Sequence, residues 1–470
     1  MRIVIFGLAA MLSVACNNRA DLQCVQASAC DLSGGGMCVM ASSGNHWCAY
    51  PDPECPSGYR YSDQDVGDGV GGTCVPGDNV QLDASIDGPA SVQMDAPLNC
   101  PQSAPVQSGQ ASDLVLGQPG FTSGSANNPA LTGGSLATTV GLATDGTRLW
   151  VSDSGNARVL QWNSFPGVND QSANIAVGQP DLITTTSGTT AAEISMGGAF
   201  VARAGTKLVV ADTVNNRVLI WNSVPTQSGQ AADVVLGQTS FTTKTNGNAS
   251  TQLYSPRGIW TDGTKLIVSD RFNNRLLIWN TFPTANGAGA DVVLGASDFG
   301  MTPNISPPTA SSLHNPSGLT VHGTKLYVAD EGNNRVLIWN TIPTANNVAA
   351  DVVIGQTGFD GYFANAGAGY PQVNGVGFNG PMGVLVDECG SLYVCDALNG
   401  RALVYTHEPT TSGAAADVVL GKSTLTTQPN AGTAPSTSWM GGCSGLAVAG
   451  ATLYVGDAFN NRVLRFALSR

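Results

Sequence analysis

The sequence predicts an all-β protein whose C-terminal three quarters form a six-bladed β-propeller of four-stranded antiparallel blades. Three observations carry this prediction: two short phrases each recur six times, Gly and Pro punctuate the chain, and charged residues make up only 11% of it. Hydrophobic residues, at 42%, are ample for a core. Each repeat is a supersecondary unit that needs its neighbours to bury its apolar faces.

The first phrase has the form ADVVLGQ, and the second has the form LYVADxxNNRVLIWN with Asp five residues before Arg. Copies of the first phrase occupy residues 112–118, 173–179, 232–238, 290–296, 350–356 and 416–422. The Asp and Arg of the second phrase are Asp153 and Arg158, Asp212 and Arg217, Asp270 and Arg275, Asp330 and Arg335, Asp396 and Arg401, and Asp457 and Arg462. Six copies of each phrase predict six blades.

Each unit contains four short apolar runs, which we name strands a to d in chain order. In the third unit these runs are residues 258–261, 266–269, 275–279 and 291–294. Asp262-Gly263 between strands a and b is a hairpin signal, because both residue types tolerate positive φ. Strand c is apolar at consecutive positions, so we expect neighbouring blades to cover both faces of each sheet.

The order of the runs at the two ends of the repeat region predicts how the ring closes. The region begins with a lone strand d at residues 113–117 and ends after a strand c at residues 462–466. The first strand should therefore complete the last blade. This closure leaves the ring without a free sheet edge.

The phrase LYVADxxNNRV resembles the NHL repeat, a β-propeller family, and the resemblance covers residues 112–470. It departs most from the family pattern in the fifth unit, where Asn399-Gly400-Arg401 replaces Asn-Asn-Arg, and the units are longer than the usual repeat. The resemblance implies the fold much better than the function, because NHL propellers serve as protein-binding, RNA-binding and enzymatic modules. Enzymes of this type generally hold a metal near the channel mouth with His, Glu, Asp or Asn side chains.

Three segments are expected ahead of the propeller. Residues 1–16 have the form of an export signal, and their end resembles a lipobox in which Cys16 carries the lipid. Ser13 stands where the lipobox pattern prefers an aliphatic residue, so ordinary signal cleavage is the alternative. Residues 17–76 should form a Cys-rich mini-domain, and residues 77–111, rich in Asp, Pro and Ser, should form an extended acidic linker.

Disulfides are expected in the mini-domain, because an exported segment this small cannot bury enough apolar surface to hold itself together. Its cysteines are Cys24, Cys30, Cys38, Cys48, Cys55 and Cys74. A zinc site is set aside, since the segment has no C-x-x-C pair and His46 is its one histidine. In the propeller, Cys395 should pair with Cys443 between blades five and six, and Cys389 with Cys100; buried free thiols are the alternative.

The Asp and Arg of each unit flank the loop between strands b and c, where Asn-Asn should adopt left-handed conformations. Their sixfold repetition favours a structural role, and calcium binding would need more than one carboxylate per loop. The b-to-c and d-to-a loops should share one face, which we name the long-loop face because its d-to-a loops are long and variable. The candidate binding residues on this face are Glu193, Arg257, His314, Tyr370 and Trp439.

The leading hypothesis is a monomeric binding or scaffolding module that engages a protein or glycan of the cell envelope through the long-loop face. The alternative is a metal-dependent lyase or lactonase of the propeller type, for which His314 and Glu193 would have to approach the channel. Such side chains are scarce, so no catalytic residue, metal or cofactor is predicted. The net charge of -13 disfavours nucleic-acid partners. The chain should be exported. It should then be held at the membrane only by a lipid anchor, or alternatively be secreted.

Overall fold

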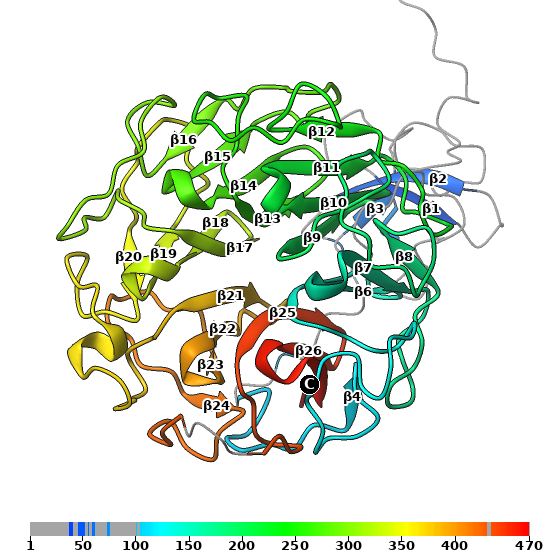
Figure 1. The fold of residues 1–470 in the computed structure, drawn as a ribbon. Helices are drawn as coiled ribbons and strands as arrows, with labels where there is room; N and C mark the ends of the chain where they lie inside the picture. Colours follow the sequence, from blue (N-terminus) through cyan, green and yellow to red (C-terminus); the bar gives the residue numbers. More distant parts are fainter. Residues whose placement is uncertain are drawn as a thin grey trace, which may run out of the picture. The chain divides into compact units, whose positions relative to one another are not determined.

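The computed structural model describes residues 37–40, 46–51, 55, 59–61, 73–75, 100, 104–429 and 434–469. The chain divides into two compact units, Met1–Ala96 and Pro97–Arg470. The second unit is the ring of six four-stranded antiparallel sheets shown in Figure 1. The predicted all-β, six-bladed propeller is therefore confirmed.

Within each blade the strands follow the order a, b, c, d, with strand a lining the central channel. Blades 1 to 3 consist of β5 (Thr139–Thr144), β6 (Leu149–Asp153), β7 (Arg158–Trp162) and β8 (Ile175–Val177); β9 (Ala199–Ala204), β10 (Lys207–Asp212), β11 (Arg217–Trp221) and β12 (Val234–Leu236); and β13 (Pro256–Thr261), β14 (Leu266–Asp270), β15 (Arg275–Trp279) and β16 (Val292–Leu294).

Blades 4 to 6 consist of β17 (Pro316–His322), β18 (Lys325–Asp330), β19 (Arg335–Trp339) and β20 (Val352–Ile354); β21 (Pro381–Val386), β22 (Leu392–Asp396), β23 (Arg401–Tyr405) and β24 (Val418–Leu420); and β25 (Cys443–Ala449), β26 (Thr452–Asp457), β27 (Arg462–Ala467) and β4 (Leu114–Leu116). The 3₁₀ helices that join strands b and c are η3 (Ser154–Asn156), η4 (Thr213–Asn215), η5 (Arg271–Asn273), η6 (Glu331–Asn333), η8 (Ala397–Asn399) and η9 (Ala458–Asn460), and η7 (Ala364–Gly367) lies in a d-to-a loop.

The ring closes as the sequence predicts. Strand β4 pairs antiparallel with β27 near the end of the chain, with Leu464 opposite Val115. In Figure 1 the cyan β4 accordingly lies beside the red strands of blade 6. The two ends of the repeat region thus hold each other in one sheet, which leaves no blade with a missing strand.

The propeller begins before residue 112, although residues 77–111 were expected to form a linker. Residues 104–111 lie along blade 6: the amide of Ser469 donates to the carbonyl of Pro105 at 2.8 Å, and Val106 is buried. These residues form the c-to-d loop of the last blade. The signal is present in the sequence, because residues 105–118 (PVQSGQASDLVLGQ) repeat residues 225–238 (PTQSGQAADVVLGQ).

The outer edge of every strand d is covered by the c-to-d loop of the following blade. In blade 2 the amide of Val235 donates to Oδ1 of Asn286 at 3.0 Å, and its carbonyl accepts from the amide of Gly287 at 2.9 Å. The same amide bond to an Asn or Ser side chain recurs around the ring as Val115 to Asn169, Ala176 to Ser228, Val235 to Asn286, Val293 to Asn346, Val353 to Ser412 and Val419 to Ser108. The edges are therefore satisfied, which disfavours pairing with another chain.

The hydrophobic core lies between adjacent blades, as the continuous apolar pattern of strand c predicts. All five residues of β11 are buried, and so are all five of β15. The cluster between blades 2 and 3 combines Ile220 of one sheet with Leu277 of the next. Both faces of each sheet are thus covered.

Two details of the turns differ from the sequence-based expectations. In the a-to-b turn of blade 3, Gly263 takes a φ of 89°, whereas Asp262 acts through its side chain and accepts the amides of Thr264 and Lys265 at 2.7 Å each. In the b-to-c loop, the second residue of Asn-Asn is left-handed, with a φ of 54° at Asn274, and the first ends helix η5. Each turn needs a single positive φ because the preceding Asp side chain or 3₁₀ turn satisfies the neighbouring amides.

Strand a of blade 2 differs from the other five. Those five each have a register shift against strand b. Their glycines are required by close packing, since a Cβ on Gly383 would lie 2.5 Å from the carbonyl oxygen of Ser444 in the next blade. Strand β9 has no such shift. The other five strands have two residues at the shift, the second of which is glycine, whereas β9 has the single buried residue Phe200. The sixfold pattern is therefore broken at the channel wall of blade 2.

Disulfides occur in both units. In the first, β1 (Met37–Met40), β2 (His46–Pro51) and β3 (Tyr59–Tyr61) form a three-stranded sheet, and Cys55 is bonded to Cys74. In the second, Cys395 is bonded to Cys443 and Cys100 to Cys389, the two pairings expected from the sequence.

Other predictions fall on residues about which less is described. Cys38 and Cys48 stand opposite each other in the register of β1 and β2. Cys16, Cys24 and Cys30 lie outside the described residues. Within the described part of the chain, no helix is long and apolar enough to cross a membrane.

Candidate functional site

The six Asp–Arg pairs are buried ion pairs that repeat around the long-loop face. In each pair the Nε of Arg donates to Oδ2 of the Asp five residues earlier, and both side chains are 0% exposed. The pairs are Asp153 with Arg158, Asp212 with Arg217, Asp270 with Arg275, Asp330 with Arg335, Asp396 with Arg401, and Asp457 with Arg462.

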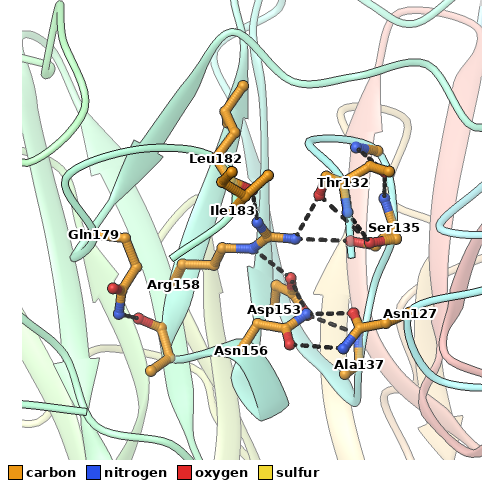
Figure 2. A network of polar contacts seen from close by, with 12 residues as sticks. Asn127, Thr132, Ser135, Ala137, Asp153, Asn156, Arg158, Gln179, Leu182 and Ile183 are labelled. Atoms are coloured by element: carbon orange, nitrogen blue, oxygen red, sulfur yellow. Dashed lines mark hydrogen bonds and ion pairs between the residues drawn. The ribbon is translucent and has the colours of Figure 1, made fainter. Parts of the chain in front are cut away.

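Figure 2 shows how the aspartate of blade 1 is satisfied. Oδ1 of Asp153 accepts the amide of Ala137 at 2.7 Å, and Oδ2 accepts from Nε of Arg158 at 2.6 Å and from Nδ2 of Asn156 at 2.8 Å. Both carboxylate oxygens are thus bound by N–H donors. Because these donors already occupy both oxygens, the geometry disfavours the calcium role considered for these aspartates.

The guanidinium of Arg158 ties together loops from two blades. Its Nη2 donates to the carbonyls of Thr132 at 3.0 Å and Ser135 at 2.9 Å in the preceding d-to-a loop, and its Nη1 donates to the carbonyl of Leu182 in the following one. The arginines of the other five units make equivalent bonds to backbone carbonyls. The long loops are therefore pinned at six points, and the pairs serve the structure of the whole face.

Burial raises the pKa of aspartates in these pairs. It raises the pKa of Asp270 to about 6, although Arg275 opposes the shift. Burial likewise raises the pKa of Asp153, Asp330 and Asp396 against the effect of their arginines. Such pKa values occur at active sites, but here each carboxylate faces N–H donors of the protein itself, so the shifts reflect desolvation within the scaffold.

The sixfold repetition of the long-loop face is broken between blades 3 and 4. Charged side chains occur there at positions that are neutral in the other four units. Arg257 of β13 donates to Oε2 of Glu331 at 2.7 Å, and Arg271 of η5 donates to Oε1 of the same carboxylate at 3.0 Å. The positions equivalent to Arg271 and Glu331 in the other units hold Ser154, Thr213, Ala397 and Ala458. Two guanidinium groups thus share one carboxylate, at positions where four other units form the same loop with a neutral side chain.

Two exposed aromatic rings adjoin these charges. Tyr254 and Phe272 are 37% and 43% exposed and meet edge to face, with their centroids 5.1 Å apart. The guanidinium of Arg271 lies 4.7 Å from the centroid of Phe272. We name Tyr254, Arg257, Arg271, Phe272 and Glu331 the blade 3–4 cluster. It combines apolar surface with cationic groups, a combination suited to recognising a ligand that carries both features.

The cluster has one positive charge in excess. Burial lowers the pKa of Arg257, and Glu331 opposes that shift. The Nε of Arg271 is buried and has no hydrogen-bond partner among the described residues. The overall charge of the chain is -13, so a local excess of arginine is unusual in this molecule. An anionic group would supply the hydrogen-bond acceptor that this arginine lacks.

The structure places the other sequence-predicted candidates in loop-stabilising roles. Donation from the amide of Thr190 holds the pKa of Glu193 below its usual value, and the carboxylate closes its own loop. The ring of His314 lies against Gly332. Neither residue is among those that line the channel cavity.

Tyr370 and Trp439 are not part of the blade 3–4 cluster. Tyr370 is exposed in the d-to-a loop that leads to blade 5. Trp439 lies beneath the Nζ of Lys422, which is 3.6 Å from the ring, and its carbonyl accepts from Arg462 at 2.7 Å. Trp439 therefore stabilises the loop before blade 6, while Tyr370 remains available for contact. Among the residues that the structure describes, no three His, Cys, Asp or Glu side chains lie together as metal ligands.

Sequence reasoning singled out Arg257 but missed Arg271, Phe272 and Glu331 as partners. The available signal was the column after the strand-b Asp, in which four units have a small neutral residue and the two adjacent units have Arg271 and Glu331. Opposite charges at equivalent positions of neighbouring blades could have been paired across the ring.

Neither a protein-family model nor a curated protein sequence matches the chain. Among solved structures, a streptogramin B lyase is 11% identical, with a TM-score of 0.38 over 73% of this chain and 96% of its own. A gluconolactonase from Xanthomonas campestris is 15% identical, with a TM-score of 0.40 over 78% and 99%. A virginiamycin B lyase from Staphylococcus aureus is 12% identical, with a TM-score of 0.36 over 71% and 96%. The propeller assignment rests on the strand pairings described above, and the NHL relationship remains a resemblance of the repeat phrases.

Proposed function

We propose that the protein is a binding module of the cell envelope that engages a protein or glycan through the long-loop face, with the blade 3–4 cluster at the centre of the contact. The observation that carries the proposal is the break in the sixfold charge pattern of this face at Arg271 and Glu331. A feature repeated in all blades serves the ring, whereas a charged group that occurs once acts locally.

The chemistry of the cluster defines what it would recognise. Two guanidinium groups around Glu331 leave N–H donors for an acidic group, and Tyr254 and Phe272 offer exposed ring surface beside them. An acidic sugar or an acidic peptide segment with an apolar neighbour satisfies both requirements. The surrounding loops are held by buried arginines, so the face is ordered before binding, which lowers the entropic cost of association.

Binding is tested with the full exported chain and a matched pair of variants. Phe272 and Phe459 hold equivalent positions in η5 and η9, and both are exposed, but only Phe272 has an arginine against its ring. We expect Phe272→Ala and Arg271→Ala to reduce binding to an array of acidic oligosaccharides and envelope peptides by at least about tenfold, and Phe459→Ala to leave it unchanged. Equal effects of Phe272→Ala and Phe459→Ala would contradict a localised site.

Metal content separates this function from the metal-dependent lyase or lactonase considered as its alternative. We expect mass spectrometry of the purified chain to find no stoichiometric metal, and His314→Ala and Glu193→Ala to leave the result unchanged. A stoichiometric metal that is lost in either variant would overturn the binding-module proposal and favour the enzyme.

We also propose that the chain is exported and anchored through a lipid on Cys16. The three disulfides of the described residues support an oxidising compartment. Metabolic labelling with a fatty-acid analogue should mark the wild-type chain, and Cys16→Ala should be unlabelled and released from membranes. Labelling that survives the substitution would place the lipid elsewhere, and no labelling at all would favour secretion.

A further inference from the structure

The central channel contains a cavity of about 260 Å³ whose lining is polar and apolar in nearly equal parts. Strands a of all six blades line it, through residues such as Val140, Ala143 and Trp260. An apolar cavity of about 150 Å³ is enough to hold a benzene molecule. The channel is therefore large enough for a small organic ligand with an apolar body.

A single charged side chain, Arg203, is found among the described residues that line this cavity. It stands near the end of β9, where strand a approaches the a-to-b turn, and its register partner in strand b is Leu208. The equivalent positions of the other blades hold Thr144, Thr261, Val321, Val386 and Val448. The other five blades form the same strand pairing with a neutral side chain at this position. The blade structure therefore does not require an arginine there.

The guanidinium of Arg203 lacks a full set of acceptors. Its Nε is buried and has no hydrogen-bond partner among the described residues, and the side chain is 25% exposed. The closest carboxylate oxygen, Oδ2 of Asp145, is 3.9 Å away and is bonded to Arg148 at 3.0 Å. Burial lowers the pKa of Arg203, Asp145 opposes the shift, and Arg148 adds to it. Two arginines thus compete for one carboxylate, and the Nε of Arg203 is left without an acceptor among the described residues.

Towards the long-loop face, neighbouring blades pack closely against one another. There the glycines of neighbouring strands a meet the backbone of the next blade, as Gly258 meets Ser317, with room for no Cβ. Phe200 fills the wall of blade 2, with the guanidinium of Arg257 5.8 Å from its ring. Arg257 already has Glu331 as its acceptor at 2.7 Å. A ligand would therefore place its polar group at Arg203 and its apolar body along the channel.

We propose that the central channel binds a small carboxylate with an apolar body, whose carboxylate pairs with Arg203. The cavity, the break in the sixfold pattern and the buried donor without an acceptor support the site independently of one another. A neutral ligand of the same shape would leave the donor unsatisfied. This site lies at the a-to-b turns, on the face opposite the long loops, so it is separate from the function proposed above.

Fluorine NMR of the full chain tests the site with para-fluorobenzoate and its neutral counterpart, para-fluorobenzyl alcohol. We expect saturable binding of the carboxylate and at least about tenfold weaker binding of the alcohol. Arg203→Thr, which installs the residue found in blades 1 and 3, should weaken carboxylate binding by about tenfold and leave alcohol binding unchanged. Ala143→Phe should block both probes by filling the channel.

Lys265→Thr is the matched control, because Lys265 is a cation of the same face that does not line the cavity. It should leave both affinities unchanged. Circular dichroism establishes that each variant is folded, and Arg203→Lys, which keeps the charge, should retain part of the carboxylate preference. The proposal is overturned if the folded wild-type protein shows no saturable binding, if Arg203→Thr binds the carboxylate as tightly as wild type, or if Lys265→Thr weakens binding equally.

Discussion

Replacing Arg275 with Met should destabilise the propeller far more than the loss of a surface ion pair would. Arg275 is 0% exposed and donates to Oδ2 of Asp270 at 2.8 Å, to the carbonyl of Asn248 at 2.6 Å and to that of Ala249 at 3.1 Å. Methionine fills much of the volume but leaves Asp270 buried without its counter-ion. Breaking a buried pair in this way costs about 3–5 kcal/mol of unfolding free energy.

The pH dependence of this cost identifies its cause. Burial already raises the pKa of Asp270 to about 6 with Arg275 present, and removing the arginine raises it further. A carboxyl whose folded pKa lies above its unfolded value contributes stability at low pH that is lost as the pH rises. The deficit of Arg275→Met relative to wild type should therefore be largest above about pH 7 and shrink towards about pH 5.

Urea unfolding followed by tryptophan fluorescence measures these differences. Arg465→Met is the control, because Arg465 pairs with Asp113 at 2.9 Å with side chains 25% and 50% exposed, and its loss should cost no more than about 1 kcal/mol. Asp270→Asn combined with Arg275→Met should recover part of the loss. The reasoning is refuted if Arg275→Met costs no more than the control, if its deficit is independent of pH, or if the double variant shows the sum of two losses.

Three further predictions concern other parts of the ring and use the same unfolding measurement. Burial lowers the pKa of Lys422 to about 8, so wild-type unfolding free energy should rise between about pH 8 and 10, and Lys422→Gln, the residue of four other units, should abolish that rise. Cys395→Ala with Cys443→Ala should cost about 4 kcal/mol, and an unchanged midpoint under oxidising conditions would contradict the staple. Gly383→Ala should cost about 1–3 kcal/mol by clashing with the next blade, whereas Gly300→Ala, with open space around it, should be neutral.

The fold could be predicted because it is encoded redundantly. Six copies of each phrase gave the number of blades, and the unmatched strand d at residues 113–117 gave the closure through β4. The boundary at residue 112 was wrong because a c-to-d loop has no apolar periodicity, and only comparison with residues 225–238 identifies it. Turn details were missed because residue type indicates a left-handed position without showing which neighbour the side chain satisfies.

The candidate site could be predicted only in part, because it depends on differences between units and on proximity across blades. Arg257 and Glu331 are 74 residues apart, and nothing in either local segment indicates the other. Glu193 looked like a channel residue by position, but its carboxylate is used by the amide of Thr190 within the same loop. Local hydrogen bonds of this kind decide whether a polar side chain is available, and a sequence does not display them.

The bonds made by the six buried arginines explain how one scaffold tolerates such different loops. Arg217 donates to the carbonyls of Thr190 at 3.1 Å and Glu193 at 2.8 Å, and Arg335 donates to those of Thr309 at 3.0 Å and Ser312 at 2.8 Å. All these acceptors are backbone atoms, so the loops are held whatever side chains they carry. Substitution on the loop surface therefore costs the ring little, and a binding face can diverge while its support stays constant. The same separation explains why the recurring phrases of the repeat specify the fold, whereas the residues that depart from them, Arg271 and Glu331 on one face and Arg203 in the channel, are those for which we propose ligands.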